Sequence, residues 1–188
     1  MQEPSDSSRN TLTVQEDKLI QFFVRHPPFF FQLVSKRYPW PEELFPKYGA
    51  MWNLSQLSRN ARVTADDIEN NKGKWDWFEL SSNEGLQWSI ELIERFRESW
   101  NWARLSLNPS LPWSIELIQR YINRWAWWNM IGLNQGMPWS TELINRFRDN
   151  WNWDQLSSNE HIPWSISILD QFKDSWNWSV LAQNSSLP

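Results

Sequence analysis

The chain repeats itself with a period of about 25 residues, and this periodicity constrains its fold more than any other feature. The stretch from Trp139 to Asn159 contains Trp-Ser, Leu-Ile, Phe, Trp-x-Trp and Leu-Ser-x-Asn in that order. The same residue pattern recurs two units earlier, between Trp88 and Asn108. Self-similarity at such a period is typical of proteins whose units stack in a line and share one core. The sequence therefore predicts a solenoid.

Six units are expected to follow an N-terminal segment that lacks the repeat. Residues 1–12 are polar and aperiodic, and we predict a disordered leader there. Residues 13–38 contain two apolar runs, which we predict to be an N-terminal helical cap over the end of the stack, with a separate functional domain as the alternative. The units then span 40–62, 63–87, 88–112, 113–138, 139–163 and 164–188. No distinct cap follows the last unit, so we expect further units or a partner to cover it.

Each unit is expected to begin with an α-helix of about three turns. In the fifth unit, steps of three and four residues place five apolar side chains on one helical face. These side chains are Trp139, Leu143, Ile144, Phe147 and Trp151. The serine after the first Trp is the expected N-cap, because its hydroxyl can accept from an otherwise unpaired amide.

A second, shorter helix is expected to start within the Trp-x-Trp pair. Residues two apart on a helix point about 200° apart, so a break must separate these two Trp. The residue between them is a good N-cap, Asn or Asp, in all units except the fourth, which has Ala126. Asn108 and its equivalents are expected to close this helix in the left-handed conformation. The predicted fold class is all-α, an α-solenoid of six short two-helix repeats with an N-terminal helical cap.

Composition and charge argue against several functions. The chain has no Cys and only two His, His26 and His161, which leaves no residue set suited to a metal site. Its net charge is −4 with both signs interspersed, which disfavours duplex nucleic acid. No stretch approaches the roughly 20 apolar residues of a membrane helix, and we expect a cytoplasmic protein. We identify no catalytic constellation, and we expect no cofactor.

Three arginines at equivalent positions are the first candidate for partner binding. Arg95, Arg120 and Arg146 each follow a Glu by four residues, a spacing that brings opposite charges together on a helix. Stacking of the units would align these arginines in a basic stripe. The stripe is either a solvated, salt-bridged face or a surface that binds an acidic partner.

Two units depart from the pattern in ways that bear on function. The fourth unit has one extra residue after Trp127-Trp128, so one indole can leave the core, and we select Trp128 as a candidate contact residue. The second unit has Val63, Asp67 and Asn71 where others have Trp, Leu and Phe. Its core is expected to be thinner, which indicates a degenerate unit, a hinge or an interaction notch.

The unit as a whole, Pro-Trp-Ser followed by Leu-Ile, Phe, Trp-Asn-Trp and Leu-Ser-x-Asn, resembles tandem repeats of uncharacterised tryptophan-rich proteins of bacteria and giant viruses. The resemblance covers Trp40 to Pro188 and is strongest from Trp88 onward. It supports the repeat and implies no activity and no site residues.

We therefore expect a non-enzymatic helical-repeat scaffold that binds an unidentified protein partner through an elongated surface. A second hypothesis is an aromatic groove in which exposed indoles bind a glycan or single-stranded nucleic acid. A third is an enzyme whose site lies at the junction of the N-terminal cap and the second unit.

Overall fold

The computed structural model describes residues 21–22, 25–26, 57–59, 63–128 and 131–188. The predicted leader, and nearly all of the predicted cap and first unit, lie outside these residues. The described part is helical and has no strand. Its nine short α-helices and one 3-10 turn are α5 (Ala65–Asn70), α6 (Trp77–Ser81), α7 (Ile90–Arg95), α8 (Trp102–Leu107), α9 (Ile115–Arg120), η1 (Ile131–Leu133), α10 (Thr141–Arg146), α11 (Trp153–Ser158), α12 (Ile166–Gln171) and α13 (Trp178–Leu181).

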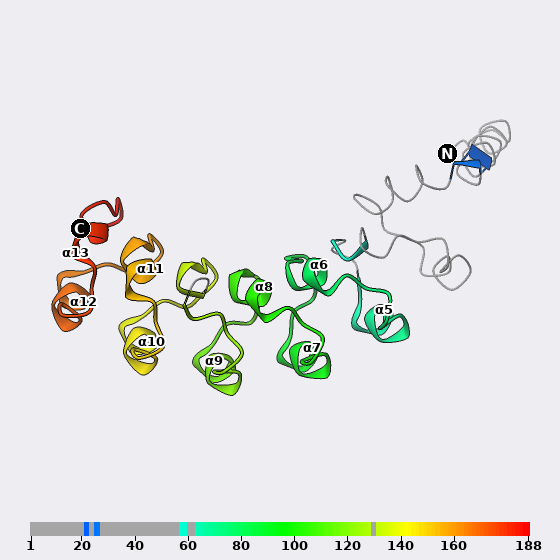
Figure 1. Ribbon diagram of the computed structural model, residues 1–188, viewed down its shortest axis with the longest axis horizontal. Helices are drawn as coiled ribbons and strands as arrows, with labels where there is room; N and C mark the ends of the chain where they lie inside the picture. Colours follow the sequence, from blue (N-terminus) through cyan, green and yellow to red (C-terminus); the bar gives the residue numbers. More distant parts are fainter. Residues whose placement is uncertain (1–20, 23–24, 27–56, 60–62, 129–130) are drawn as a thin grey trace, which may run out of the picture.

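The helices alternate between two rows along an elongated array (Figure 1). Helices α5, α7, α9, α10 and α12 form the lower row, and α6, α8, α11 and α13 form the upper row, with η1 between α8 and α11. The chain crosses from one row to the other after each helix. Helices neighbouring in a row therefore come from successive units.

The lower-row helices begin as predicted and end earlier than predicted. The Ser140 hydroxyl accepts from the Leu143 N–H at 3.1 Å, and Ser89, Ser114 and Ser165 cap their helices in the same way. The prediction of three turns is wrong, because α10 has six residues and Phe147 leaves the helix with φ −117° and ψ 26°. The Trp151 indole N–H donates to the main-chain oxygen of Ile144 at 3.0 Å. This bond satisfies a carbonyl that a longer helix would have used itself.

The upper-row helices confirm the predicted N-caps. The Asn101 side chain accepts from the Arg104 N–H, and Asp76, Asn152 and Asn177 act in the same way. In the fourth unit Ala126 supplies no such acceptor, and the 3-10 turn η1 replaces the α-helix.

The left-handed conformation predicted for the asparagines at the ends of these helices is wrong. No described residue other than Gly has a positive φ, and Asn108 is extended, with φ −73° and ψ 114°. Its buried side chain instead accepts from the Ser110 N–H at 2.9 Å and donates to the main-chain oxygen of Ser81 in the preceding unit at 3.1 Å. The same bond links Asn83 to Ser58, Asn134 to Ser106, Asn159 to Gly132 and Asn184 to Ser157. We call this set the asparagine ladder.

A second set of hydrogen bonds between units uses buried serines. The Ser81 hydroxyl accepts from the main-chain N–H of Asn101 in the next unit at 2.9 Å and donates to the Trp77 main-chain oxygen at 2.6 Å. Ser58, Ser106 and Ser157 accept equivalent bonds from Asp76, Ala126 and Asn177. The fourth unit has Gly132 at this position. Serine and asparagine together fix the spacing of successive units.

Aromatic rings fill the space between units. Trp102 of the third unit meets Tyr121 and Trp125 of the fourth, with ring centroids 4.8 Å and 5.0 Å apart, and Trp113 adds a fourth ring. Equivalent clusters form around Trp77, Trp127 and Trp153. Most described Trp side chains are buried, as the inward periodicity predicts. Edge-to-face pairs of this kind add to the stabilisation from burial.

Candidate interaction surface

The first predicted site residue, Arg95, is engaged within the array. Its Nε donates to the Glu69 carboxylate at 3.2 Å, and its Nη1 lies 3.7 Å from Asp66. Both carboxylates belong to α5 of the preceding unit. The predicted pairing of Arg95 with Glu91, four residues earlier on its own helix, is therefore wrong. The long Arg side chain reaches two carboxylates of the neighbouring unit instead of one on its own.

Arg120 and Arg146 lie at the same position of their units, and the ion pairs found in the described part do not include either one. Their predicted pairs with Glu116 and Glu142 are also wrong. Arg146 lacks the contact made by Arg95 because Gln119 stands in the preceding unit where Arg95 meets Glu69. The three arginines are thus aligned by sequence position but differ in their surroundings.

Glu94 forms a polar cluster between the third and fourth units. It accepts hydrogen bonds from the Tyr121 hydroxyl and from Arg97. These two bonds, the tyrosine first, lower the pKa of Glu94, and the charge of Arg120 adds a smaller effect. Arg120 is therefore part of the electrostatics between units rather than an isolated cation.

The second predicted site residue, Trp128, is the most exposed described indole. Its side chain is 72% exposed, whereas Trp127 beside it is 9% exposed. The Asn152 side chain of the next unit donates to the Trp128 main-chain oxygen at 2.7 Å. The backbone is thus held while the indole projects into solvent, as predicted for one of these two rings.

Three further exposed apolar side chains accompany Trp128. Phe78 on α6 and Trp128 both follow the second Trp of a Trp-x-Trp pair, and Leu107 and Leu133 both precede a ladder asparagine. Helix α6 contacts α8, and α8 contacts η1, so Phe78, Leu107 and Leu133 come from adjacent elements of the upper row. Trp128 precedes η1 in the same unit as Leu133. We call Phe78, Leu107, Trp128 and Leu133 the outer apolar row.

One cation borders this row. The Arg104 guanidinium of α8 lies over the Phe78 ring of α6, 3.8 Å from its centroid. A cation stacked on a ring keeps hydrogen-bond donors at its edge available to an acceptor. The outer apolar row is therefore flanked by a positive charge at its N-terminal end.

The sequence offered a signal for the residues that we had not selected. The fifth and sixth units carry Asp154 and Ser179 where Phe78 stands, the third has the small Ala103 there, and the second and fifth units carry Ser82 and Ser158 where Leu107 stands. An apolar residue at a position that is polar in sister units indicates a surface with a role beyond packing. Phe78 and Leu107 neither remove an apolar residue from the core pattern nor change the length of a unit, so the periodicity does not single them out.

The described part provides no other assembled site from the predictions. No group of three His, Cys, Asp or Glu side chains gathers among these residues, and none of their helices is long and apolar enough to cross a bilayer. The cytoplasmic location stays a prediction. The cap side of the proposed enzyme site lies outside the described residues.

The helical fold and the recurring aromatic clusters define the chain as a tryptophan-rich helical repeat protein. Searches of protein families, of curated proteins and of solved structures found no match. The resemblance to uncharacterised tryptophan-rich proteins of bacteria and giant viruses also stays a prediction.

Proposed function

We propose that the chain is an α-solenoid of six units with an N-terminal cap, and that it is a non-enzymatic scaffold for a protein partner. The outer apolar row, centred on Trp128, carries this proposal. Trp128 is 72% exposed, and Phe78, Leu107 and Leu133 are exposed in the same or the two preceding units, which is unfavourable in water unless these side chains serve an interaction. Exposed Trp and Arg on an anchored backbone are the residue types that dominate binding energy at protein interfaces.

The chemistry of the row defines the partner surface that it fits. Phe78, Leu107, Trp128 and Leu133 offer an apolar strip along three successive units. Arg104 at one edge favours an acidic side chain opposite it, because its guanidinium lies over the Phe78 ring and the described ion pairs do not include it. The partner is therefore expected to present an apolar strip flanked by a carboxylate.

The test is quantitative binding by the full chain, because each candidate residue has a matched control. A partner is captured from an extract of the native host, purified, and titrated against wild type and variants by calorimetry. Trp128→Ala is expected to weaken binding by about 30-fold, the effect of an interface hot spot. Trp178→Ala, at a 54% exposed indole outside the row, is expected to leave affinity unchanged. Equal affinities of wild type and Trp128→Ala would end the proposal.

The arginine stripe is tested separately. Reversal of Arg95, Arg120 and Arg146 to Glu replaces three positive charges of the lower row with three negative charges and leaves the outer apolar row intact. If partner binding is unchanged, the stripe belongs to the solvated face. If binding is lost while the fold is retained by circular dichroism, an acidic partner contacts the lower row instead.

An aromatic groove for a glycan or single-stranded nucleic acid is the alternative, and two exposed indoles of the upper row, Trp128 and Trp178, favour it. The intervening unit carries Asp154 beside a half-buried Trp153, which disfavours a phosphate backbone there. Titration of Trp fluorescence with glycan and oligonucleotide panels distinguishes the two functions, since flat responses are expected for the scaffold.

A further inference from the structure

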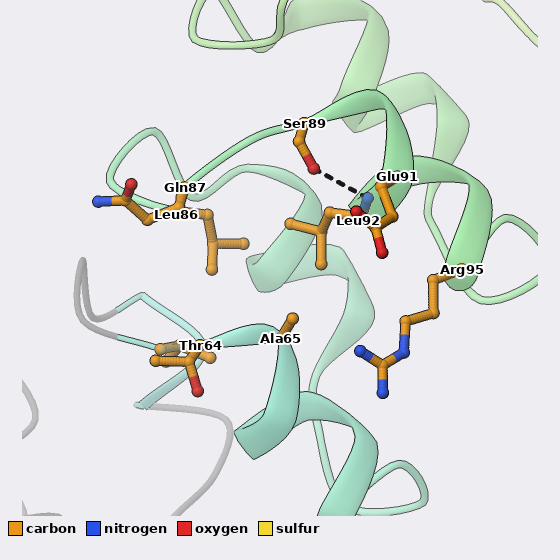
Figure 2. A pocket seen from close by; sticks show the side chains of 9 residues that line it. Thr64, Ala65, Leu86, Gln87, Ser89, Glu91, Leu92 and Arg95 are labelled. Carbon is orange, nitrogen blue, oxygen red and sulfur yellow. Dashed lines mark hydrogen bonds between the residues drawn. The ribbon is translucent and has the colours of Figure 1, made fainter.

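A cavity of about 220 Å³ lies between the second and third units, at the start of α5 and of α7 (Figure 2). Its lining residues come from both units. The apolar ones are Val63, Ala65, Leu86 and Leu92, and the polar ones are Thr64, Gln87, Ser89, Glu91 and Arg95. A volume of this size suits one ring system, since sites for drug-sized ligands usually exceed about 300 Å³.

Two substitutions specific to the second unit explain why this space exists. Val63 stands where the following units have Trp88, Trp113, Trp139 and Trp164. Ala65 stands where the third and fourth units have Ile90 and Ile115. Protein interiors are normally filled to the density of organic crystals, and apolar cavities left by lost side chains can bind aromatic molecules. The cavity therefore lies where the second unit carries these two smaller apolar side chains.

Two charged side chains, Glu91 and Arg95, line the cavity. Arg95 at the rim pairs with Glu69 and Asp66, and Lys72 pairs with Glu69 at 3.0 Å. Glu91, whose carboxylate lies beside Leu92 in Figure 2, forms no ion pair in the described part. Arg95 is thus paired with carboxylates of α5, whereas Glu91 has no cationic partner among the described ion pairs. Glu91 is therefore the charged group that a ligand in the cavity can pair with, because Arg95 already pairs with two carboxylates.

We propose that this cavity binds a small aromatic amine, with its ring between α5 and α7 and its ammonium group on the Glu91 carboxylate. The ring replaces apolar contacts that Trp and Ile supply in other units. The site lies in the lower row, away from the outer apolar row. It is therefore independent of the scaffold function, and either proposal can fail without the other.

The experiment uses the full chain with labelled Val, Leu and Ile methyl groups, observed by nuclear magnetic resonance. The probes are phenethylamine, its uncharged analogue phenethyl alcohol, and phenylacetate. Phenethylamine is expected to shift the methyl signals of Val63, Leu86 and Leu92 in a saturable manner. We expect it to bind about threefold more tightly than the alcohol, as one solvent-exposed charge pair provides, and phenylacetate to bind more weakly than both.

Two pairs of variants test the location and the charge. Val63→Trp restores the residue of the other units and is expected to abolish binding, and Ala65→Ile is expected to weaken it by partial filling. Glu91→Gln is expected to remove the preference for the amine over the alcohol. Glu142→Gln, at the same position of the fifth unit, is the control and is expected to preserve that preference. Thermal melts confirm that each variant is folded.

Three results would overturn the proposal. They are the absence of saturable shifts at the three methyl groups with phenethylamine, unchanged shifts in folded Val63→Trp, and equal or tighter binding of phenylacetate. Because none of these readouts involves Trp128, a negative result here leaves the scaffold proposal to its own test.

Discussion

The hydroxyl group of Tyr121 donates a hydrogen bond to the Glu94 carboxylate, linking the end of α9 to the end of α7 in the preceding unit. The third, fifth and sixth units have Phe96, Phe147 and Phe172 at this position, so they cannot form this polar contact. Burial, followed by this hydrogen bond, raises the pKa of Tyr121 to about 12.

This pKa predicts how stability falls in alkali. The pKa of a tyrosine hydroxyl in an unfolded chain is about 10, so the folded state holds the Tyr121 proton more tightly. The resulting stabilisation is complete below the unfolded pKa and is lost as the pH rises through the folded value of about 12. A spectrophotometric titration of tyrosinate should show a late component in wild type that Tyr121→Phe lacks. Loss of an early component in the variant instead would contradict the assignment.

The asparagine ladder predicts a large effect at Asn108. Its buried side chain makes three hydrogen bonds, to the main chain of Ser81, Asn83 and Ser110. Asn108→Ala removes the side-chain partner of the Ser81 oxygen and of the Ser110 N–H, while the Asn83 oxygen keeps its bond from the Trp88 indole. We expect a loss of about 2–4 kcal/mol in the free energy of unfolding. Denaturant titration followed by circular dichroism measures this loss.

Asn184→Ala is the matched control for that substitution. Asn184 makes the same three hydrogen bonds to Ser157, Asn159 and Ser186, but it lies half-buried in the last unit. Water can replace the lost partners there, so the expected cost is only about 1 kcal/mol. Similar costs at both positions would mean that burial does not determine the strength of the ladder.

The gap in the serine set predicts a stabilising substitution. A Cβ atom at Gly132 would lie 3.5 Å from the Gln155 side chain, an ordinary contact. The Gln155 Oε1 atom is buried without a hydrogen-bond partner in the described part. Gly132→Ser brings a hydroxyl to this oxygen, and we expect a gain of about 1 kcal/mol in unfolding free energy. Gly132→Ala separates the backbone effect, and equal melting temperatures of the two variants would exclude the hydrogen bond.

A second glycine predicts the opposite effect. A Cβ atom at Gly136 would lie 2.0 Å from the main-chain oxygen of Pro109 in the preceding unit, closer than any real contact. Gly136→Ala therefore requires the two units to separate locally, at an expected cost of about 1–3 kcal/mol. At Gly73 a Cβ atom meets nothing within 4 Å, so Gly73→Ala is the control and should be neutral or slightly stabilising. Urea unfolding of the two variants compares these costs.

The local features of each unit could be predicted from sequence because their causes are local. Ser140 and Asn152 cap helices through bonds to residues three positions away, and periodicity alone places Leu105 and Leu156 in the core. Residue type and spacing contain this information in full. The same holds for most buried indoles.

Features that depend on the neighbouring unit could not be predicted in the same way. The bond from Asn108 to Ser81 spans 27 residues, and Asn at a helix end has a more familiar local explanation. The early end of α10 depends on the Trp151 indole N–H competing for a main-chain oxygen, which apolar periodicity does not represent. The ion pairs of Arg95 could not be predicted either, because its partners are carboxylates of the neighbouring unit that are close in space and distant in sequence.

Every described unit offers the next one the same kinds of donors and acceptors, through the ladder asparagines and the indole N–H groups. Copies joined in this way are interchangeable, because the edge left by removing one matches the edge of its successor. A chain of this kind can gain or lose whole units during evolution and still use the same contacts between neighbouring units. Reach can thus be altered in discrete steps while the side chains that recognise a partner evolve separately on the outside.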